Sequence, residues 1–323
     1  MRKFIFVIAV SVVLLASIAA AQAQAYPNRP IRLLIGWPAG GGPDTVTRIL
    51  AEQLSKSLGQ PVVVENRPGA AGIIAGELLA KSPPDGYTLI YSVIGQYAIY
   101  PSLYKKLPYD PVKDFAPISL ITNNGLVLVT SVSLPAKSLK ELIAYAKANP
   151  GKISYASGGS GGVPHLAMEM LKSMTGTDMV HVPYKGMVQA IPDLLAGQVH
   201  VMFDNLPNEL PNIKAGKVRA LAVTTARRNT QLPQIPTFAE AGVPDFEVMG
   251  SSAMFTRAGV PKPIIARLNA ELVKALNSPD VKARLQELGV EPAPSTPERV
   301  AAYQKSEIVK WAKVVKDTGA TVD

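Results

Sequence analysis

The chain contains two glycine-rich turns, each preceded by a short apolar run and followed by a helix-like stretch. The first turn, between Ile31–Ile35 and Thr45–Leu58, is Trp37-Pro38-Ala39-Gly40-Gly41-Gly42-Pro43-Asp44. The second, between Ile153–Ala156 and His165–Met174, is Ser157-Gly158-Gly159-Ser160-Gly161-Gly162-Val163-Pro164-His165. A strand that turns through glycines into a helix start presents unpaired backbone N–H groups beside the positive end of the helix dipole. Each turn is therefore predicted to bind an anion without a basic side chain.

Apolar, β-branched runs alternate with helical patterns along most of the chain. Strands are predicted at Ile31–Ile35, Val62–Glu65, Thr88–Val93, Ile118–Ile121, Leu126–Val129, Ile153–Ala156, Met179–Pro183, His200–Phe203, Arg219–Val223 and Val248–Phe255. Helices between them include Thr45–Leu58, Gly72–Lys81, Ser138–Ala148, Val188–Ala196 and Pro263–Leu276, and a closing helix is predicted at Pro297–Lys316. This order is typical of α/β proteins with parallel, doubly wound sheets, whose ligands bind beyond the carboxyl ends of the strands. Both glycine turns lie at such ends, so two facing domains would place them across one cleft.

The first 25 residues have the pattern of a cleaved export signal. Arg2 and Lys3 precede the apolar run Phe4–Ala20, and Ala23-Gln24-Ala25 is a small-x-small cleavage site. A membrane anchor is disfavoured because the apolar run is short for a bilayer and polar residues follow it. The chain has no cysteine, which excludes disulfides, thiolate metal sites, a thiol nucleophile and a lipid-modified N-terminus.

The length after the signal fits two domains of ordinary size. A boundary is predicted near Asn123-Asn124-Gly125 and a return crossing near Ala241-Gly242-Val243-Pro244. The first domain is then discontinuous, comprising residues 26–124 and 246–323, and the second comprises residues 125–245. The formal net charge is +9, but the lysines are scattered and the aromatic residues are few, so no nucleic-acid platform is expected.

One of the turns also matches a catalytic pattern. Gly158–Gly162 reads G-x-S-x-G, which is typical of a nucleophile elbow, so an exported serine hydrolase is an alternative. A triad needs an acid and then a histidine downstream, and only His165, His181 and His200 exist. The chain also has no Walker A or G-x-G-x-x-G motif, no H-x-x-x-H spacing and no accompanying carboxylate cluster. We therefore expect no enzymatic activity, no cofactor and no metal.

Several polar residues near the turns have two interpretations each. Asp44 is either a first-turn carboxylate that complements the helix dipole or an acceptor for a ligand hydroxyl, amine or water. His165 is either a cap partner or a donor into the cleft. Tyr184, Asp204 and Asn205 follow strands, which makes them candidates for the cleft, although Asp and Asn also serve turn chemistry.

Motifs along the chain resemble those of the periplasmic solute-binding receptors of tripartite tricarboxylate transporters, the Bug family. The similarity covers nearly all of the chain after the signal. The residues that carry it are Tyr26-Pro27 with Arg29-Pro30, Pro38–Gly42 with Asp44, Asn66-Arg67-Pro68-Gly69-Ala70, Pro84-Asp85-Gly86-Tyr87-Thr88-Leu89, Tyr109-Asp110-Pro111 with Lys113-Asp114-Phe115, Tyr155-Ala156-Ser157, His165-Leu166, His181–Gly186 and Phe203-Asp204-Asn205.

The resemblance implies a clamshell of two domains hinged by crossing strands, with a small carboxylate held between them by backbone amides and water. Matching positions implicate as ligand-binding residues Pro38, Ala39, Gly40, Gly41, Gly42, Asp44, Ser157, Gly158, Gly159, Ser160, His165, Tyr184 and Asp204. The implied protein is a periplasmic monomer that delivers its ligand to membrane transporter subunits; a solute-sensing subunit for a membrane signalling partner is the alternative.

Two segments depart from the pattern of this family. The second turn has Gly162-Val163-Pro164 where relatives often carry serines, and Met249–Ala253 lacks an aromatic residue that many relatives have. Both segments are expected at the cleft, so a ligand other than the commonest dicarboxylates is compatible with this sequence.

Overall fold

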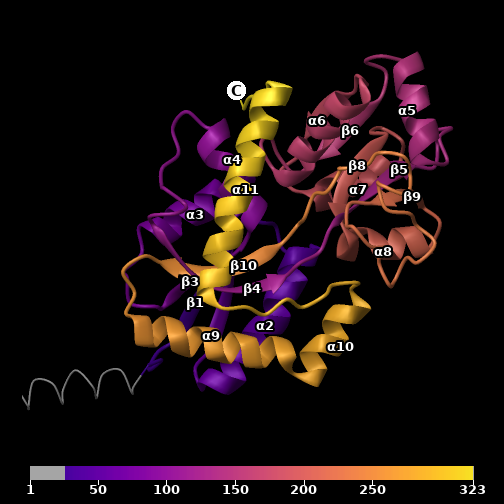
Figure 1. The fold of residues 1–323 in the computed structure, drawn as a ribbon. Helices are drawn as coiled ribbons and strands as arrows, with labels where there is room; N and C mark the ends of the chain where they lie inside the picture. The colour runs from indigo at the N-terminus through magenta and orange to yellow at the C-terminus, as the bar shows by residue number, and fades with distance from the viewer. Residues whose placement is uncertain (1–25, 323) are drawn as a thin grey trace, which may run out of the picture.

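The computed structural model describes residues 26–322, and the expected signal peptide, Met1–Ala25, lies outside them. The described residues form two five-stranded sheets with helices packed on them (Figure 1). The predicted α/β class with two domains is therefore confirmed. Within residues 26–322, every helix is too short or too polar to span a bilayer.

The first domain is built on a sheet of order β2-β1-β3-β10-β4. Its strands are β1 (Ile31–Ile35), β2 (Val62–Asn66), β3 (Thr88–Val93), β4 (Phe115–Thr122) and β10 (Ser252–Arg257). Its helices are η1 (Ala70–Gly72), α3 (Ile73–Ala80) and α4 (Ile94–Leu103), then α2 (Gly42–Leu58), α9 (Lys262–Asn277), α10 (Pro279–Glu287) and α11 (Pro297–Thr318). Because side chains alternate along a strand, Leu33 packs toward α2 and α9 whereas Leu34 packs toward α3 and α4.

The second domain is built on a sheet of order β7-β6-β8-β5-β9. Its strands are β5 (Leu126–Ser131), β6 (Ser154–Ser157), β7 (Val180–Pro183), β8 (Val201–Asn205) and β9 (Val218–Val223). Its helices are α5 (Leu139–Ala148), α6 (Val163–Thr175), α7 (Met187–Leu195) and α8 (Leu206–Lys214). Tyr155 packs with the α5 and α6 side of the sheet, and Met202 packs with α7 and α8.

Each sheet is mixed rather than wholly parallel, which differs from the prediction. β1 is parallel to β2 and β3, and β6 is parallel to β7 and β8, but β10 and β5 are antiparallel to their neighbours. Parallel neighbours within one sheet need a crossover connection, usually a helix. β5 and β10 instead enter their sheets directly from the other domain, so this requirement does not apply to them.

The two crossing segments lie side by side between the domains. Gly125 pairs with Met249 in an antiparallel bridge, and the Gly250 N–H donates to the Asn124 carbonyl at 2.6 Å. Gly125 has no room for a side chain, since an added Cβ would lie 2.6 Å from Thr225 Cγ2. The predicted division into residues 26–124 with 246–323 and residues 125–245 stays a prediction, and this paired crossing supports it.

Three helices have no counterpart in the sequence-based prediction. α4 contains Gly95 and Pro101 among aromatic residues, and α8 contains Pro207 and Pro211. These residues weaken a helical pattern, and burial of the helices against the sheets overcomes their low propensity. α10 follows α9 directly and is capped by Ser278, whose hydroxyl accepts from the Val281 N–H at 3.4 Å.

The long closing helix α11 packs on α4 and β4 and also touches α6 of the second domain (Figure 1). Trp311 on this helix is fully buried, and its Nε1 donates to Glu307 Oε2 at 2.9 Å.

We predict that Trp311→Ala lowers the free energy of unfolding by about 3–5 kcal/mol, because it removes a large side chain from a packed core. Urea denaturation followed by circular dichroism measures this loss. Val309→Ala on the same helix is the control, since Val309 is 70 % exposed and its loss should stay within about 0.5 kcal/mol. Equal effects of the two substitutions would contradict the packing of α11 described above.

Candidate functional site

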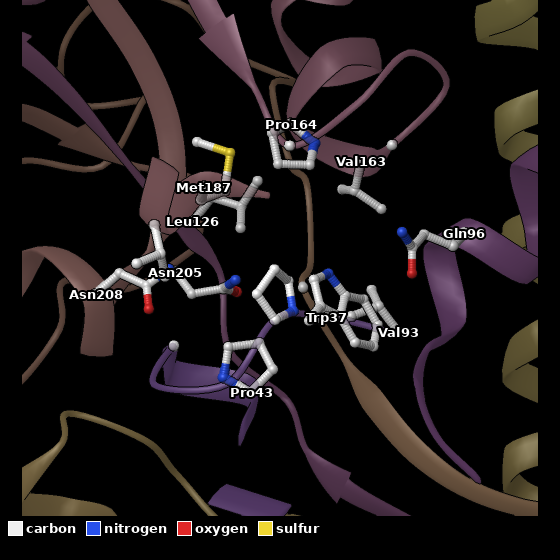
Figure 2. A pocket seen from close by; sticks show the side chains of 16 residues that line it. Trp37, Pro43, Val93, Gln96, Leu126, Val163, Pro164, Met187, Asn205 and Asn208 are labelled. Carbon is white, nitrogen blue, oxygen red and sulfur yellow. The ribbon is translucent and has the colours of Figure 1, made fainter. Parts of the chain in front are cut away.

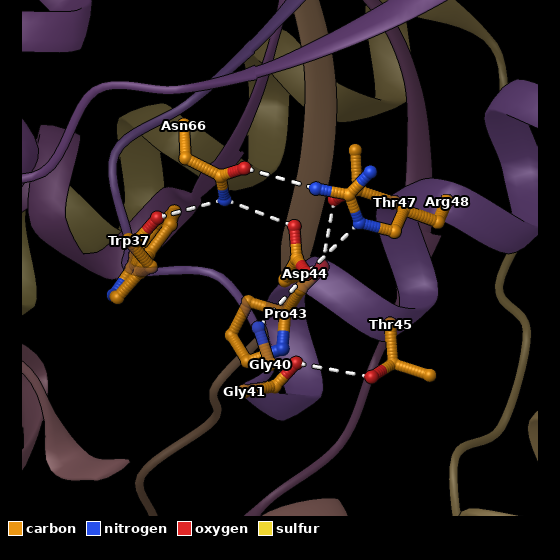
Figure 3. A network of polar contacts seen from close by, with 9 residues as sticks. All are labelled: Trp37, Gly40, Gly41, Pro43, Asp44, Thr45, Thr47, Arg48 and Asn66. Atoms are coloured by element: carbon orange, nitrogen blue, oxygen red, sulfur yellow. Dashed lines mark hydrogen bonds and ion pairs between the residues drawn. The ribbon is translucent and has the colours of Figure 1, made fainter. Parts of the chain in front are cut away.

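The first glycine turn is shaped by the Asp44 carboxylate. Asp44 Oδ2 accepts from the Gly40 N–H at 3.0 Å and from Arg48 Nε at 2.9 Å, and Oδ1 accepts from Asn66 Nδ2 at 2.9 Å (Figure 3). The same Asn66 Nδ2 donates to the Trp37 carbonyl at 3.1 Å. Asp44 is 3 % exposed and is occupied by the turn itself. Of its two interpretations, this geometry supports the structural one.

These contacts favour the ionised form of Asp44 over the protonated form. Burial alone would raise the pKa of Asp44, but the hydrogen bonds from Arg48, from the Gly40 N–H and from Asn66 outweigh burial and hold that pKa below its ordinary value. The turn therefore carries a permanent negative charge that is neutralised inside its own network.

The second glycine turn packs on two histidines, of which His165 is buried and His181 is partly buried. His165 Nδ1 accepts from the Gly161 N–H at 3.0 Å, so His165 acts as a cap partner of the turn. Its ring stacks on the ring of His181 at a centroid distance of 4.0 Å, and His181 in turn stacks on Tyr155. His181 Nε2 lies 2.6 Å from the hydroxyl of the fully buried Ser157. These side chains form a support beneath the turn.

The two turns meet at one pocket between the domains (Figure 2), with about 650 Å³ of empty space that includes its opening to solvent. The residues that line it are Trp37, Pro38, Gly41, Pro43, Val93, Gln96, Leu126, Gly158, Gly162, Val163, Pro164, Met187, Val188, Asn205, Asn208 and Gly250. No charged side chain is among them.

Helix starts surround this pocket. Five helices begin at its wall, namely α2, α4, α6, α7 and α8. The lining residues at their starts are Gly41 and Pro43 (α2); Val93 and Gln96 (α4); Gly162, Val163 and Pro164 (α6); Met187 and Val188 (α7); and Asn205 and Asn208 (α8). Each helix contributes the positive end of its dipole and the unpaired N–H groups of its first turn. The pocket therefore favours an anion although no basic side chain lines it.

The predicted site residues fall into three groups. Those that line the pocket are Pro38, Gly41 and Gly158; Gly42 lines an adjoining cavity, and Gly159, Ser160 and Tyr184 line a neighbouring cavity that shares Gly158. The buried residues that support the turns or the pocket wall are Asp44, Ser157, His165 and Asp204. Ala39 and Gly40 are exposed.

Asp204 acts on the pocket through Asn208. Both carboxylate oxygens of Asp204 lie 2.9 Å from Asn208 Nδ2, and Asn208 Oδ1 accepts from the Gly42 N–H of the other domain at 2.6 Å. Burial and the nearby Glu209 raise the pKa of Asp204 well above its ordinary value. Asp204 therefore orients an amide that joins the two domains, and it does not itself line the pocket.

Glycines allow the two domains to approach closely where they meet around the pocket. A Cβ added at Gly42 would lie 2.9 Å from Pro207 Cβ, one at Gly186 would lie 3.0 Å from Pro38 Cδ, and one at Gly95 would lie 2.7 Å from Val163 Cγ2. The glycines of the turns thus serve close packing as well as anion binding.

Other pocket residues were not among the predicted site residues. Gln96 lies on α4, which the sequence did not predict, and Met187 and Val188 are apolar residues with no polar signal. Val163 and Pro164 belong to the segment that was expected at the cleft, although they were not named as ligand-binding residues. Asn205 was recognised only as a strand-end candidate. Asn208 was detectable in principle, because it lies in the first turn of the helix that follows the strand end at Asp204 and Asn205.

The described residues do not assemble a hydrolytic site around Ser160. The Ser160 carbonyl accepts from the Tyr104 hydroxyl at 3.2 Å, whereas His165 and His181 bond Gly161 and Ser157. Within residues 26–322 no three His, Asp or Glu side chains gather closely enough to hold a metal ion.

Comparison with known proteins places the chain among receptors. Residues 46–320 match the family described as tripartite tricarboxylate transporter family receptor, TctC. Protein BugT of Bordetella pertussis is 38 % identical over 321 residues, which cover 99 % of this chain and 98 % of BugT. The structure of R. palustris Rpa4515 with adipate is 38 % identical, with a TM-score of 0.88 over 92 % of this chain and 99 % of that chain. MatC (Rpa3494) from Rhodopseudomonas palustris with bound malate is 34 % identical, with a TM-score of 0.86 over 90 % of this chain and 100 % of that chain. The matched family is one of receptors, in agreement with the prediction that this chain is a receptor and not an enzyme.

We predict that Asp44→Asn lowers the free energy of unfolding by about 1–3 kcal/mol, because the charge paired with Arg48 is lost and the new NH2 group must face either the donors of Arg48 and Gly40 or the donor of Asn66. Urea denaturation measures the loss, with Asp178→Asn at an exposed carboxylate as the control. Because the folded pKa of Asp44 lies below its unfolded value, its contribution is present near neutral pH and is lost as pH falls through the folded pKa. Equal losses in the two variants would contradict the role of Asp44 in the turn.

Another prediction concerns the stability of the fold at acidic pH. Burial, with a smaller contribution from His165, lowers the pKa of His181 to about 4. Between the ordinary value of 6.5 and 4, the unfolded chain binds a proton at this position that the folded chain does not. Stability should therefore fall as pH drops through this window, and His181→Gln should flatten the fall. Chemical denaturation at a series of pH values measures the slope, and an unchanged slope in the variant would refute the prediction.

Proposed function

The chain belongs to the tripartite tricarboxylate transporter receptor family, and we propose that it captures a small organic carboxylate in the periplasm and delivers it to a membrane transporter of that type. The observation that carries this proposal is the convergence of helix starts on an uncharged pocket between the domains. The relatives with adipate and with malate support a carboxylate as the ligand.

Backbone amides suit a ligand that must be released again. Within the described residues, the N–H groups of Gly41 and Gly158 have no hydrogen-bond acceptor, and both residues line the pocket. An amide that donates to a carboxylate forms a charge-assisted hydrogen bond, and bridging water completes such a shell at little cost. No buried counter-charge remains unpaired when the ligand leaves.

Closure of the two domains provides the signal for delivery. The domains touch through Gly42 and Asn208, and through Tyr104 and the Ser160 carbonyl. A ligand that contacts both turns binds the closed form better than the open form and shifts the population toward it. The transporter then recognises the closed form. The predicted export signal agrees with this location.

We predict that isothermal titration calorimetry with a panel of small carboxylates detects binding for at least one member. Val188→Pro should weaken that binding about tenfold or more, because proline at the second position of α7 removes an N–H and is tolerated there, as Pro43, Pro164 and Pro207 show in the first turns of α2, α6 and α8.

Val188→Ala is the matched control for this substitution, since it shortens the side chain and retains the N–H. Equal affinities of the two variants would exclude this amide as a ligand contact. Silence of the wild-type protein across aliphatic, hydroxylated and aromatic acids would overturn the proposed function itself.

A further inference from the structure

We propose that Asp204 and Glu209 share one proton and that the carboxylate ligand binds more tightly while the pair keeps it, so that capture of the ligand is coupled to uptake of a proton. This inference rests on the proposed function, because it concerns the regulation of the same pocket. It starts from two buried carboxyls near the start of α8 that are not among the residues lining the pocket.

Both carboxyls are removed from water and lack a cation. Asp204 and Glu209 are each 0 % exposed. Within residues 26–322, no ion pair includes either of them. Two buried carboxyls without a cation cannot both be ionised except at a large cost in desolvation and repulsion. The pair therefore keeps a proton at a pH at which ordinary carboxyls have lost theirs.

The charged and titratable side chains on the surrounding elements have other partners. These are Arg48 with Asp44 and Lys56 with Glu52 on α2, His165 with the Gly161 N–H and Lys172 with Glu169 on α6, Asp193 of α7 with the Tyr184 hydroxyl, Lys214 of α8 with Gln231, and Arg219 of β9 with the carbonyls of Leu134 and Ala136. The neighbouring strands β5 and β6 carry no charged residue. Neutralisation of the pair thus falls to a proton.

The hydrogen bonds of the two carboxyls are unequal. Asp204 Oδ1 accepts from the Asn205 N–H at 2.7 Å, and both oxygens of Asp204 lie 2.9 Å from Asn208 Nδ2. Glu209 Oε2 has only a long contact of 3.5 Å with Asn212 Nδ2, and Glu209 Oε1 has no hydrogen-bond partner among the described residues. Burial raises the pKa of Glu209 to about 7, and burial together with the charge of Glu209 raises the pKa of Asp204. The proton belongs to the pair and is lost as the pH rises through neutrality.

The charge of this pair acts on the anion pocket. Asn205 and Asn208, which both donate to Asp204, lie on one wall of the pocket (Figure 2). Glu209 lies in the first turn of α8, where a negative charge opposes the positive end of the helix dipole. While the pair keeps its proton, more of this positive end is available to a carboxylate. Loss of the proton adds a buried negative charge that repels the ligand.

Thermodynamic linkage makes this coupling reciprocal. A bound carboxylate raises the proton affinity of the pair by the same factor by which the proton raises the affinity for the carboxylate. The ligand itself stays ionised near neutral pH, because ordinary carboxyl groups titrate at about pH 4. A proton taken up on binding therefore goes to the protein.

Proton uptake on binding tests this inference. Adipate is titrated calorimetrically at about pH 7 in MOPS and in Tris, and the difference between the observed heats gives the number of protons bound, because the ionisation enthalpies of these buffers differ. We expect net uptake of protons by the wild-type protein. We also expect the affinity for adipate to be about three- to tenfold lower at about pH 8 than at about pH 6.

The absence of uptake together with a constant affinity would overturn the inference and leave the proposed carboxylate receptor intact. If adipate does not bind, the tightest-binding member of the carboxylate panel replaces it. Silence of the whole panel would instead overturn the proposed function.

Glu209→Gln tests which group holds the proton. This substitution keeps the shape of the side chain and removes its ionisable group, so proton uptake and the pH dependence of adipate binding should largely disappear. Glu287→Gln makes the same change at an exposed position on α10 and should retain both. Proton uptake by the Glu209→Gln variant equal to that of the wild type would refute the assignment.

A measurement without ligand tests the pair separately. A carboxyl whose folded pKa is raised above its unfolded value binds a proton on folding, so the folded state loses stability as the pH rises toward the folded pKa. In urea denaturation, the ratio of the folding constant of Glu209→Gln to that of the wild type should rise at least about tenfold between about pH 5 and about pH 8. A constant ratio would show that the pair holds no such proton and would overturn the inference whatever the ligand.

Discussion

Both connections between the two sheets lie at the carboxyl ends of the parallel strands, and the candidate site depends on this constraint. β4 ends at Thr122 and β5 begins at Leu126, so the link covers residues 123–125 and spans at most roughly 14 Å. The return segment is paired with it through Gly125 and Met249. In strand–helix units the helix begins where the strand ends, so edges joined in this way bring helix starts from both domains together. The anion pocket is thus a consequence of topology before it is a consequence of any side chain.

The pocket obtains its charge preference from the backbone rather than from basic residues. A helix start is equivalent to roughly half an elementary charge, and several such starts line this pocket. Side chains then determine which backbone N–H groups at these helix starts remain free to bind an anion. Asn208 and the prolines at the starts of α2, α6 and α8 withdraw N–H groups, whereas α7 retains its own. Proline therefore limits the number of free N–H groups at this pocket, in addition to its usual role of starting helices.

The sequence predicted the alternation of strands and helices, because this alternation follows from local patterns. It also predicted that the two turns face one cleft, because ligands of such sheets bind beyond the carboxyl ends of the strands. It did not predict the antiparallel strands β5 and β10, since strand direction is set by long-range topology. The role of Asp44 was left open for a related reason: whether a carboxylate faces a ligand or its own turn depends on partners such as Asn66, which are distant in sequence. Gln96 was not predicted as a site residue because its helix, α4, was not predicted. Burial against the sheet stabilises α4 although Gly95 and Pro101 have low helix propensity.

The contact between Asn208 and Gly42 bears on how tightly such a receptor binds. It joins the domains through groups of the protein alone, and Asp204, buried beside Glu209, holds the amide in place. Part of the free energy of closure is then supplied by the protein. The ligand then needs to supply only the rest of the free-energy difference between the open and closed forms. Its apparent affinity rises as a larger fraction of the free protein already adopts the closed, binding-competent form. The same contact occupies the Gly42 N–H, so this donor at the start of α2 is not available to a ligand while the domains are joined in this way.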